Sequence, residues 1–192
     1  SDWTAAFLNP AALTLAKRIK FSCGFHNIAF KNSLMDGVQK TSKTEYSNSP
    51  LSHISIVYPV PVFRGALVWS FAYSKTADYA SSYSLKSADE YPSSSFTDSG
   101  DESTFSFSLA TQLSRYFSGG LALNLSNGKH TASFSQLVSE FGSIYEYSQD
   151  IKTSYNALKL SLGGLYQVNS NLQLGLQLVF PTVNKVEAND FD

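Results

Sequence analysis

The chain has few of the residues that build common functional sites. Its 192 residues include one cysteine, Cys23, and three histidines. A single cysteine excludes an intramolecular disulfide framework, and no cysteine–histidine spacing matches a zinc site. Only 15% of the residues are charged and the net charge is -1, with no cluster of lysine and arginine, so the composition argues against a nucleic-acid binder. We predict no metal and no cofactor.

Long apolar runs are also missing. No uninterrupted stretch approaches the roughly 18 to 20 residues that a membrane-spanning helix needs, so a helical membrane protein is excluded, whereas a barrel of strands is not. The start, Ser1-Asp2-Trp3, lacks the basic segment and apolar core of an export signal. A mature or cropped chain would have such a start.

In many segments of the chain, apolar and polar residues alternate with a period of two. From Leu172 to Phe180 every second residue is leucine or phenylalanine. Helical spacing would place these side chains on different faces, so we predict a strand with one apolar face. In the run from Gly65 to Ser74, Val68 is the exception to this alternation. Similar alternation predicts seven strands in all, over residues 19–25, 53–58, 65–74, 105–110, 121–126, 158–163 and 172–180.

The connections between these strands alternate strictly between short and long. Transmembrane barrels have this rhythm because their inner turns only reverse the chain, while their outer loops are free to grow. A soluble sandwich also alternates in hydrophobicity, but a compact domain seldom has three long connections. The short turns are at 59–64, 114–119 and 169–171, and the long polar connections at 31–51, 75–103 and 127–153.

Aromatic residues gather near the short turns. We interpret them as the inner girdle of a barrel, where amphipathic rings favour the boundary between membrane and water. The alternative is that they cap the core of a sandwich. The residues are Tyr58, Phe63, Tyr116, Phe117 and Tyr166.

These patterns predict an all-β fold, an antiparallel transmembrane β-barrel of which the chain supplies about seven strands. Residues 1–18 are predicted to be the remnant of an N-terminal plug and 19–192 a partial barrel. A short helix is predicted over 9–18, with Asn9 as its cap, Pro10 in its first turn, and Lys17 and Arg18 at its end. Residues 186–192 are interpreted as the start of a loop, and further strands are expected beyond it because bacterial barrels close with an even number.

Two segments carry a family pattern. The first is Asn9-Pro10-Ala11, preceded by Thr4-Ala5-Ala6-Phe7-Leu8, and the second is Gly164-Leu165-Tyr166 followed by Leu172-Gln173-Leu174-Gly175 and Phe180-Pro181-Thr182. In both, the chain resembles the FadL/TodX family of outer-membrane transporters for long-chain fatty acids and other hydrophobic compounds. The resemblance implies a barrel of about 14 strands, contact with lipid of the bacterial outer membrane, and a fatty acid-like ligand. Most of the family's plug and about half of its strands are absent from this sequence, as in a fragment.

Candidate ligand-binding residues lie first in the plug and on the polar strand face. By the resemblance, Phe7, Leu8 and Leu13 could line the inner end of a ligand path, or they could simply pack against strands. Lys20 and Lys159 are the cations of the face that would line the lumen. Either could bind a carboxylate in a partly dry barrel, or bond to neighbouring lumen groups.

A third candidate group lies in the predicted loop from 128 to 150. Its apolar residues recur at three- and four-residue steps over 137–145, which predicts a short amphipathic helix. The resemblance implies an outer hydrophobic groove that captures substrate, and Phe134, Leu137 and Phe141 could form its wall. Packing of loop on loop over the barrel mouth is the alternative.

Three functions are considered: a passive channel for hydrophobic compounds, a structural or adhesive barrel, and a polar-solute porin. A porin should have no plug, so Asn9-Pro10-Ala11 weighs against it. No Gly-x-Ser-x-Gly pattern occurs, and we do not predict an enzyme. The favoured prediction is passive uptake, with the structural or adhesive barrel as the alternative. The substrate and the oligomeric state are left open.

Overall fold

The structure, a computed structural model, is dominated by one large antiparallel sheet. It describes residues 4–26, 28–36, 40–48, 51–79, 81–86, 93–140, 143–169, 172–180 and 184–191. Within these ranges a short helix, α1 (Ala5–Leu8), and a 3-10 helix, η1 (Pro10–Leu15), precede eleven strands. The strands are β1 (Lys20–Phe25), β2 (Ile28–Asp36), β3 (Lys40–Asn48), β4 (Leu51–Val60), β5 (Leu67–Asp78), β6 (Ser81–Lys86), β7 (Ser93–Gln112), β8 (Phe117–Glu140), β9 (Ser143–Gln167), β10 (Gln173–Phe180) and β11 (Asn184–Phe191).

The helical start forms where it was predicted but is shorter. Asn9 caps η1, since its Oδ1 accepts a hydrogen bond from the Ala11 amide at 3.0 Å, and Pro10 occupies the first turn. The backbone becomes extended at Ala16, so Lys17 and Arg18 lie beyond the helix and not at its end. Among the described residues, no helix is long and apolar enough to cross a bilayer.

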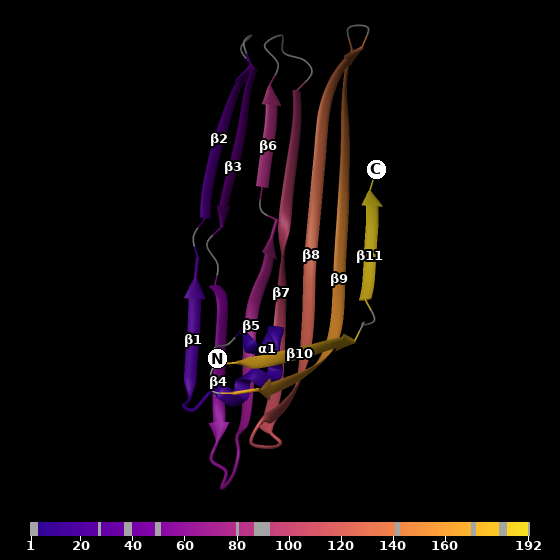
Figure 1. Cartoon of the computed structure of the whole chain (residues 1–192). Coiled ribbons are helices and arrows are strands. Elements are labelled where there is room, and N and C mark those ends of the chain that lie inside the picture. The colour runs from indigo at the N-terminus through magenta and orange to yellow at the C-terminus, as the bar shows by residue number, and fades with distance from the viewer. Residues whose placement is uncertain are drawn as a thin grey trace.

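The strands pair in two tiers (Figure 1). The lower tier runs β1-β4-β5-β7-β8-β9-β10. In the upper tier β7 also pairs with β6, β6 with β3, and β3 with β2. β9 also pairs with β11. The β7–β8 register is continuous from Ser93–Leu137 to Gln112–Ser118. Among the described strands no pairing joins β1 to β10 or β11, so the sheet is open.

The predicted long connections are wrong, because most of their length is strand. β2 reaches Asp36 and β3 covers Lys40–Asn48, β6 lies within 75–103, and β8 and β9 cover 127–140 and 143–153. β11 likewise replaces the loop predicted after residue 185. These segments carry polar residues in both phases, so they lack the apolar alternation that marks a strand in sequence, although their backbones still pair.

The helix predicted over 137–145 is also wrong. Val138 pairs with Tyr145, and Ser139 with Ile144, across the β8–β9 hairpin. Valine, isoleucine and tyrosine favour strands. When the β8–β9 ladder continues through these residues, their backbone groups form hydrogen bonds across the hairpin. The three- and four-residue spacing is therefore a coincidence of a short segment.

The three short turns are confirmed and lie together. They connect β4 to β5, β7 to β8, and β9 to β10. The first two are at the lower edge in Figure 1, and the third lies beside the second, where the Gln167 amide donates to the Tyr116 carbonyl. Gly65, in the first turn, has φ of 77°, a left-handed conformation that glycine adopts at little cost. The turns thus define one edge of the sheet.

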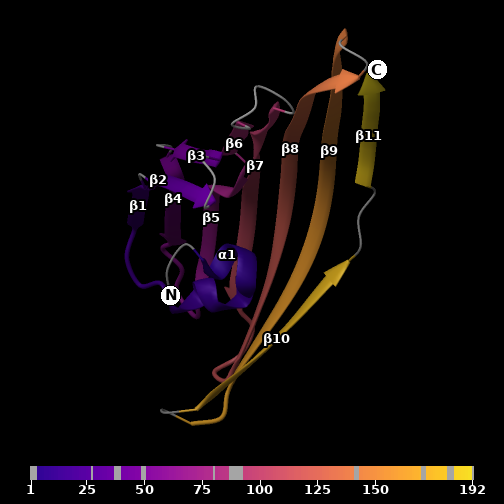
Figure 2. The same cartoon turned by 90° about the horizontal axis from the view of Figure 1, so that it is seen from above.

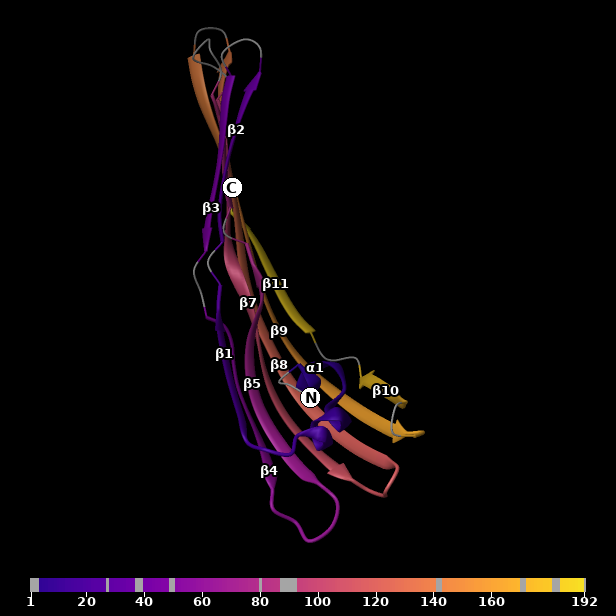
Figure 3. The ribbon, with the colours of Figure 1, turned by 60° about the vertical axis from the view of Figure 1, so that its left-hand side comes forward.

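The sheet is curved, and the helical segment lies on its concave side (Figures 2 and 3). Fully buried Leu13 packs in a small core with Val57, Val68 and Ala110, contributed by β4, β5 and β7. We call residues 4–16 the plug. The plug and the concave face therefore form the interior of this structure.

Candidate functional site

The convex face carries a continuous apolar surface, which we call the belt. On β7, β8 and β9 every second residue is a large apolar side chain that is at least 37% exposed. The register places these side chains in level rows across the three strands. The belt on these strands consists of Phe105, Phe107, Leu109, Leu121, Leu123, Leu125, Leu158, Leu160 and Leu162; Phe21, Ile54 and Phe71 extend it across β1, β4 and β5.

The belt has a defined height. Together with Phe117 at its lower edge, the apolar section up to Leu125 covers about 26 Å of β8, at about 3.3 Å per residue. Above Leu125 the same face becomes polar at once, because the next row consists of Ser103, Asn127 and Asn156. The strands themselves continue much further, to Glu140 in β8. The length of the apolar section is close to the roughly 9–11 residues of a transmembrane β-strand.

The predicted aromatic girdle lies at the lower edge of the belt. Phe63, Tyr116, Phe117 and Tyr166 are all exposed there, and Phe63 is fully exposed. Tyr58 is half-buried and stacks on Trp69 with ring centroids 5.5 Å apart. The rings therefore share one edge, and they do not cap a closed core.

The concave face has the opposite composition. The buried side chains of β5, β7, β8 and β9 are small or polar: Val68, Ser70, Ala72, Thr104, Ser106, Ser108, Ala110, Ser118, Ala122, Asn124, Ser126, Ala157 and Ser161. They form short hydroxyl contacts, such as Thr104 to Ser126 at 2.8 Å. Small residues allow the plug to approach the strand backbones closely.

Three glycines form a seat for the plug. A Cβ atom at Gly163 would lie 2.2 Å from Asn9 Oδ1, one at Gly120 would lie 2.5 Å from the Ala11 nitrogen, and one at Gly175 would lie 2.9 Å from Asn9 Nδ2. Real Cβ atoms do not approach other atoms so closely. Gly120 and Gly163 are also cross-strand partners. Asn9-Pro10-Ala11 therefore occupies space that side chains would otherwise fill.

Hydrogen bonds hold the plug on this seat. Asn9 Nδ2 donates to the carbonyl of Gly164 at 3.1 Å and to that of Leu176 at 3.5 Å. Gln177 Nε2 donates to the Phe7 carbonyl at 3.0 Å. The asparagine thus caps η1 with its oxygen and fastens η1 to β9 and β10 with its nitrogen.

The predicted plug residues lie in different surroundings. Leu13 is fully buried under β4, β5 and β7, Phe7 is half-buried, and Leu8 is 69% exposed. Leu13 therefore packs in the core, and only Leu8 presents most of its side chain to open space.

The structure does not bring the two predicted lysines together. Lys20 is on β1 and Lys159 on β9, with β4, β5, β7 and β8 between them. Both are exposed in the concave phase of their strands. Lys159 is the cross-strand partner of Asn124, whose buried Oδ1 accepts no hydrogen bond from the described residues. The Lys159 ammonium could bind a ligand carboxylate there, whereas the open Asn124 Oδ1 is an acceptor and would need a donor.

The predicted outer groove is divided between two faces. Phe134 and Leu137 are both half-buried on β8, but three residues apart on a strand they face opposite sides. Phe134 contacts Tyr147, with ring centroids 6.4 Å apart, and is the cross-strand partner of Phe96. Phe141 lies outside the described residues. We call Phe96, Phe134 and Tyr147 the aromatic patch of the upper concave face.

Sequence reasoning missed the glycine seat and two members of the aromatic patch. Gly163 and Gly175 stood in the polar phase of well-predicted strands, so their lack of a side chain was a signal for close contact. Val68 was an apolar exception in the same phase, and both Val68 and Val57 are buried near the plug. Phe96 stands among serines and was assigned to a loop.

No protein-family model matches this chain, and no curated protein matches it significantly. The FadL/TodX resemblance therefore stays a prediction from Asn9-Pro10-Ala11 and the hairpin of β9 and β10.

Proposed function

We propose that this chain is part of a plugged outer-membrane β-barrel through which hydrophobic compounds such as long-chain fatty acids diffuse passively. One observation carries the proposal: the strands expose an apolar belt on the convex face while the plug is seated on the concave face. A contiguous apolar surface of this extent is rare on soluble monomers. In a bilayer, lipid chains would cover it, and further strands would pair the open edges.

A plug argues for a selective passage and against an open porin. Asn9 and Gln177 bond it to the wall, and the glycine seat leaves little room for a wide pore on this side. The FadL/TodX resemblance, which includes the same Asn-Pro-Ala segment, supports a hydrophobic ligand. No covalent chemistry or cofactor is part of the proposal.

The aromatic patch is the proposed first contact for the ligand. Phe96 and Tyr147 are 37% and 55% exposed, and they flank Phe134 above the plug. Apolar rings on the inner face would take up an acyl chain that arrives at the barrel mouth. Below them, the Lys159 ammonium would bind its carboxyl group.

The test compares two substitutions on β8 that differ in the face they affect. The full chain in dodecyl maltoside is titrated with a fluorescent long-chain fatty acid. Phe134→Asp should weaken binding about tenfold, equivalent to about 1.4 kcal/mol, whereas the control Leu137→Asp should leave it within about twofold. Equal effects of the two substitutions would refute a ligand site on the concave face.

A structural or adhesive barrel is the second candidate. The observation that favours it is the β8–β9 ladder, which continues to Glu140–Ser143, far above the belt. A long, paired hairpin suits a surface structure that contacts other molecules. Mass spectrometry of organic extracts from the purified full chain separates the two: stoichiometric hydrophobic ligand supports uptake, and only bulk lipid at the level of a control barrel supports the alternative.

A further inference from the structure

A polar groove lies on the convex face, directly above the belt. Its volume is about 430 Å³, within the usual range for small-molecule sites. The floor is formed by neighbouring rows of β7, β8 and β9, and the belt residues Phe105, Leu125 and Leu158 lie immediately below it. The lining side chains are those of Asp101, Ser103, Asn127, Lys129, Ser154 and Asn156.

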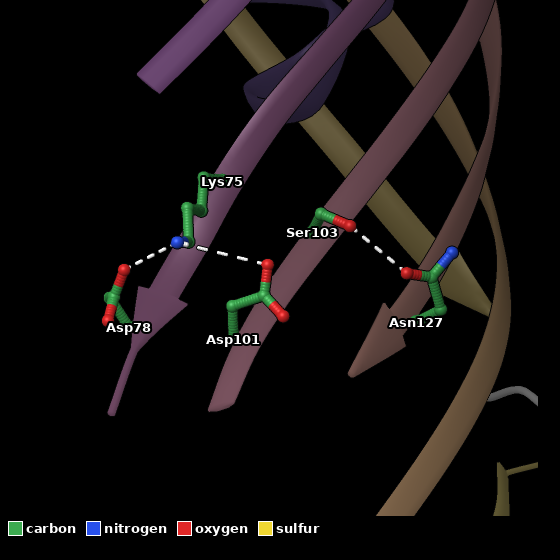
Figure 4. Close-up of polar contacts among 5 residues, drawn as sticks. All are labelled: Lys75, Asp78, Asp101, Ser103 and Asn127. Atoms are coloured by element: carbon green, nitrogen blue, oxygen red, sulfur yellow. Dashed lines mark hydrogen bonds and ion pairs between the residues drawn. The ribbon is translucent and has the colours of Figure 1, made fainter. Parts of the chain in front are cut away.

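Hydrogen bonding orients the polar groups of this groove. Ser103 Oγ donates to Asn127 Oδ1 at 3.0 Å (Figure 4). The Asn127 oxygen is thereby engaged, and its amide nitrogen keeps two N–H donors for other acceptors. Asn156 and Ser154 add another amide and a hydroxyl beside it. The groove can therefore bind a group rich in oxygen atoms.

The carboxylate of the groove belongs to Asp101, and Lys75 beside the groove orients it. Asp101 lies 3.8 Å from Lys75 Nζ, and Lys75 also forms a close ion pair with Asp78 (Figure 4). Partial burial lowers the pKa of Lys75, but the hydrogen bond and charge of Asp78 and the charge of Asp101 outweigh it and raise that pKa above its usual value. Lys75 thus stays charged at neutral pH and orients Asp101 at the edge of the groove.

Lys129 supplies the positive charge of the groove. It is the cross-strand partner of Asp101 and is exposed. Within the part of the chain that the structure describes, Lys129 forms no ion pair. Its ammonium is therefore available to an external anion, next to a carboxylate that can accept from an external cation.

We propose that this groove binds the headgroup of a phosphoethanolamine lipid. The phosphate lies against Lys129 and the amide of Asn127, the primary ammonium donates to Asp101, and the acyl chains lie on Phe105, Leu125 and Leu158. The adjoining belt argues for a lipid, and the neighbouring opposite charges argue for a zwitterionic headgroup. The inference rests on the membrane location in the proposed function, but not on transport.

Two lipids and two substitutions test the groove. Dilauroyl phosphatidylethanolamine and dilauroyl phosphatidylcholine have the same phosphate and chains, and only the former has N–H donors. Native mass spectrometry of the full chain in dodecyl maltoside should show at least threefold tighter binding of phosphatidylethanolamine, about 0.65 kcal/mol. Lys129→Gln should weaken both lipids, and Asp101→Asn should abolish the preference. Equal binding of the two lipids by the unmodified chain would overturn the proposal.

Matched controls separate the groove from general charge effects. Lys159→Gln removes the same charge from the concave face of β9 and should leave the affinity for both lipids unchanged; a loss of affinity as large as that of Lys129→Gln would also overturn the proposal. Free phosphoethanolamine at millimolar concentration should not compete, because the belt contributes to binding. Competition at that concentration would contradict a lipid ligand.

The same variants distinguish this inference from the proposed function. Lys129→Gln should retain fatty acid binding, and Phe134→Asp should retain phosphatidylethanolamine binding. If the unmodified chain shows no preference for phosphatidylethanolamine, the groove is refuted and passive uptake stands. Equal fatty acid affinities of Phe134→Asp and Leu137→Asp refute the concave ligand site and leave the groove standing.

Discussion

The two faces of β7, β8 and β9 invert the usual relation between size and burial. On β8, Leu123 is 38% exposed while its neighbours Ala122 and Asn124 are nearly fully buried. In a soluble domain the large apolar side chain would be inside and the amide outside. The difference shows that the plug, not a second layer of large side chains, determines what the concave face accepts. It leaves the belt to be covered by something apolar, as the proposed lipid would do.

The largest expected effect comes from breaking the concave face at its core. Leu13→Ala removes a fully buried side chain from contact with Val57, Val68 and Ala110. We expect a loss of about 2–5 kcal/mol in the free energy of unfolding, measured by guanidinium titration of the full chain in detergent. The control Leu8→Ala, at a mostly exposed site, should cost less than about 0.5 kcal/mol. Similar losses for the two would mean that the plug does not pack as described.

A charge placed in the belt tests the convex face. Leu160→Arg should reduce the free energy of folding into phospholipid vesicles by about 2–4 kcal/mol, the cost of arginine near a bilayer midplane. Its neighbour Lys159 already places a cation on the other face, so Lys159→Arg is the control and should be close to neutral. If Leu160→Arg is also neutral, the belt does not contact lipid and the membrane proposal fails.

Two adjacent glycines, one on each face of β9, test the difference between the faces at single positions. At Gly163 a Cβ would lie 2.2 Å from Asn9 Oδ1, whereas at Gly164, on the opposite face, the nearest atom is Phe117 Cε2 at 3.6 Å. Gly163→Ala should therefore destabilise the seated plug by about 1–3 kcal/mol and speed protease cleavage near Asn9. Gly164→Ala should not affect cleavage. Unchanged cleavage in Gly163→Ala would contradict the glycine seat.

The lower part of the fold could be predicted, and the upper part could not. In the upper part of β7, residues 93–103, a loop was wrongly predicted, because serine, threonine and aspartate occupy both phases there and conceal the period of two. In the belt, leucine and serine alternate, so the strands were predicted correctly. Phe96 and Tyr147 were missed for the same reason, because they approach Phe134 only where β7, β8 and β9 pair far above the belt.

The sequence by itself determined the two-sided character of the strands, the short turns and the cap of η1 at Asn9, because alternation and capping depend on residues close together in the chain. Only the tertiary structure decided where the plug sits. Gly120, Gly163 and Gly175 form its seat through the pairing of β8 with β9 and of β9 with β10. The turns and the apolar alternation set the register within each hairpin, but the meeting of these glycines with Asn9 and Ala11 joins residues more than a hundred positions apart, and no local pattern specifies it.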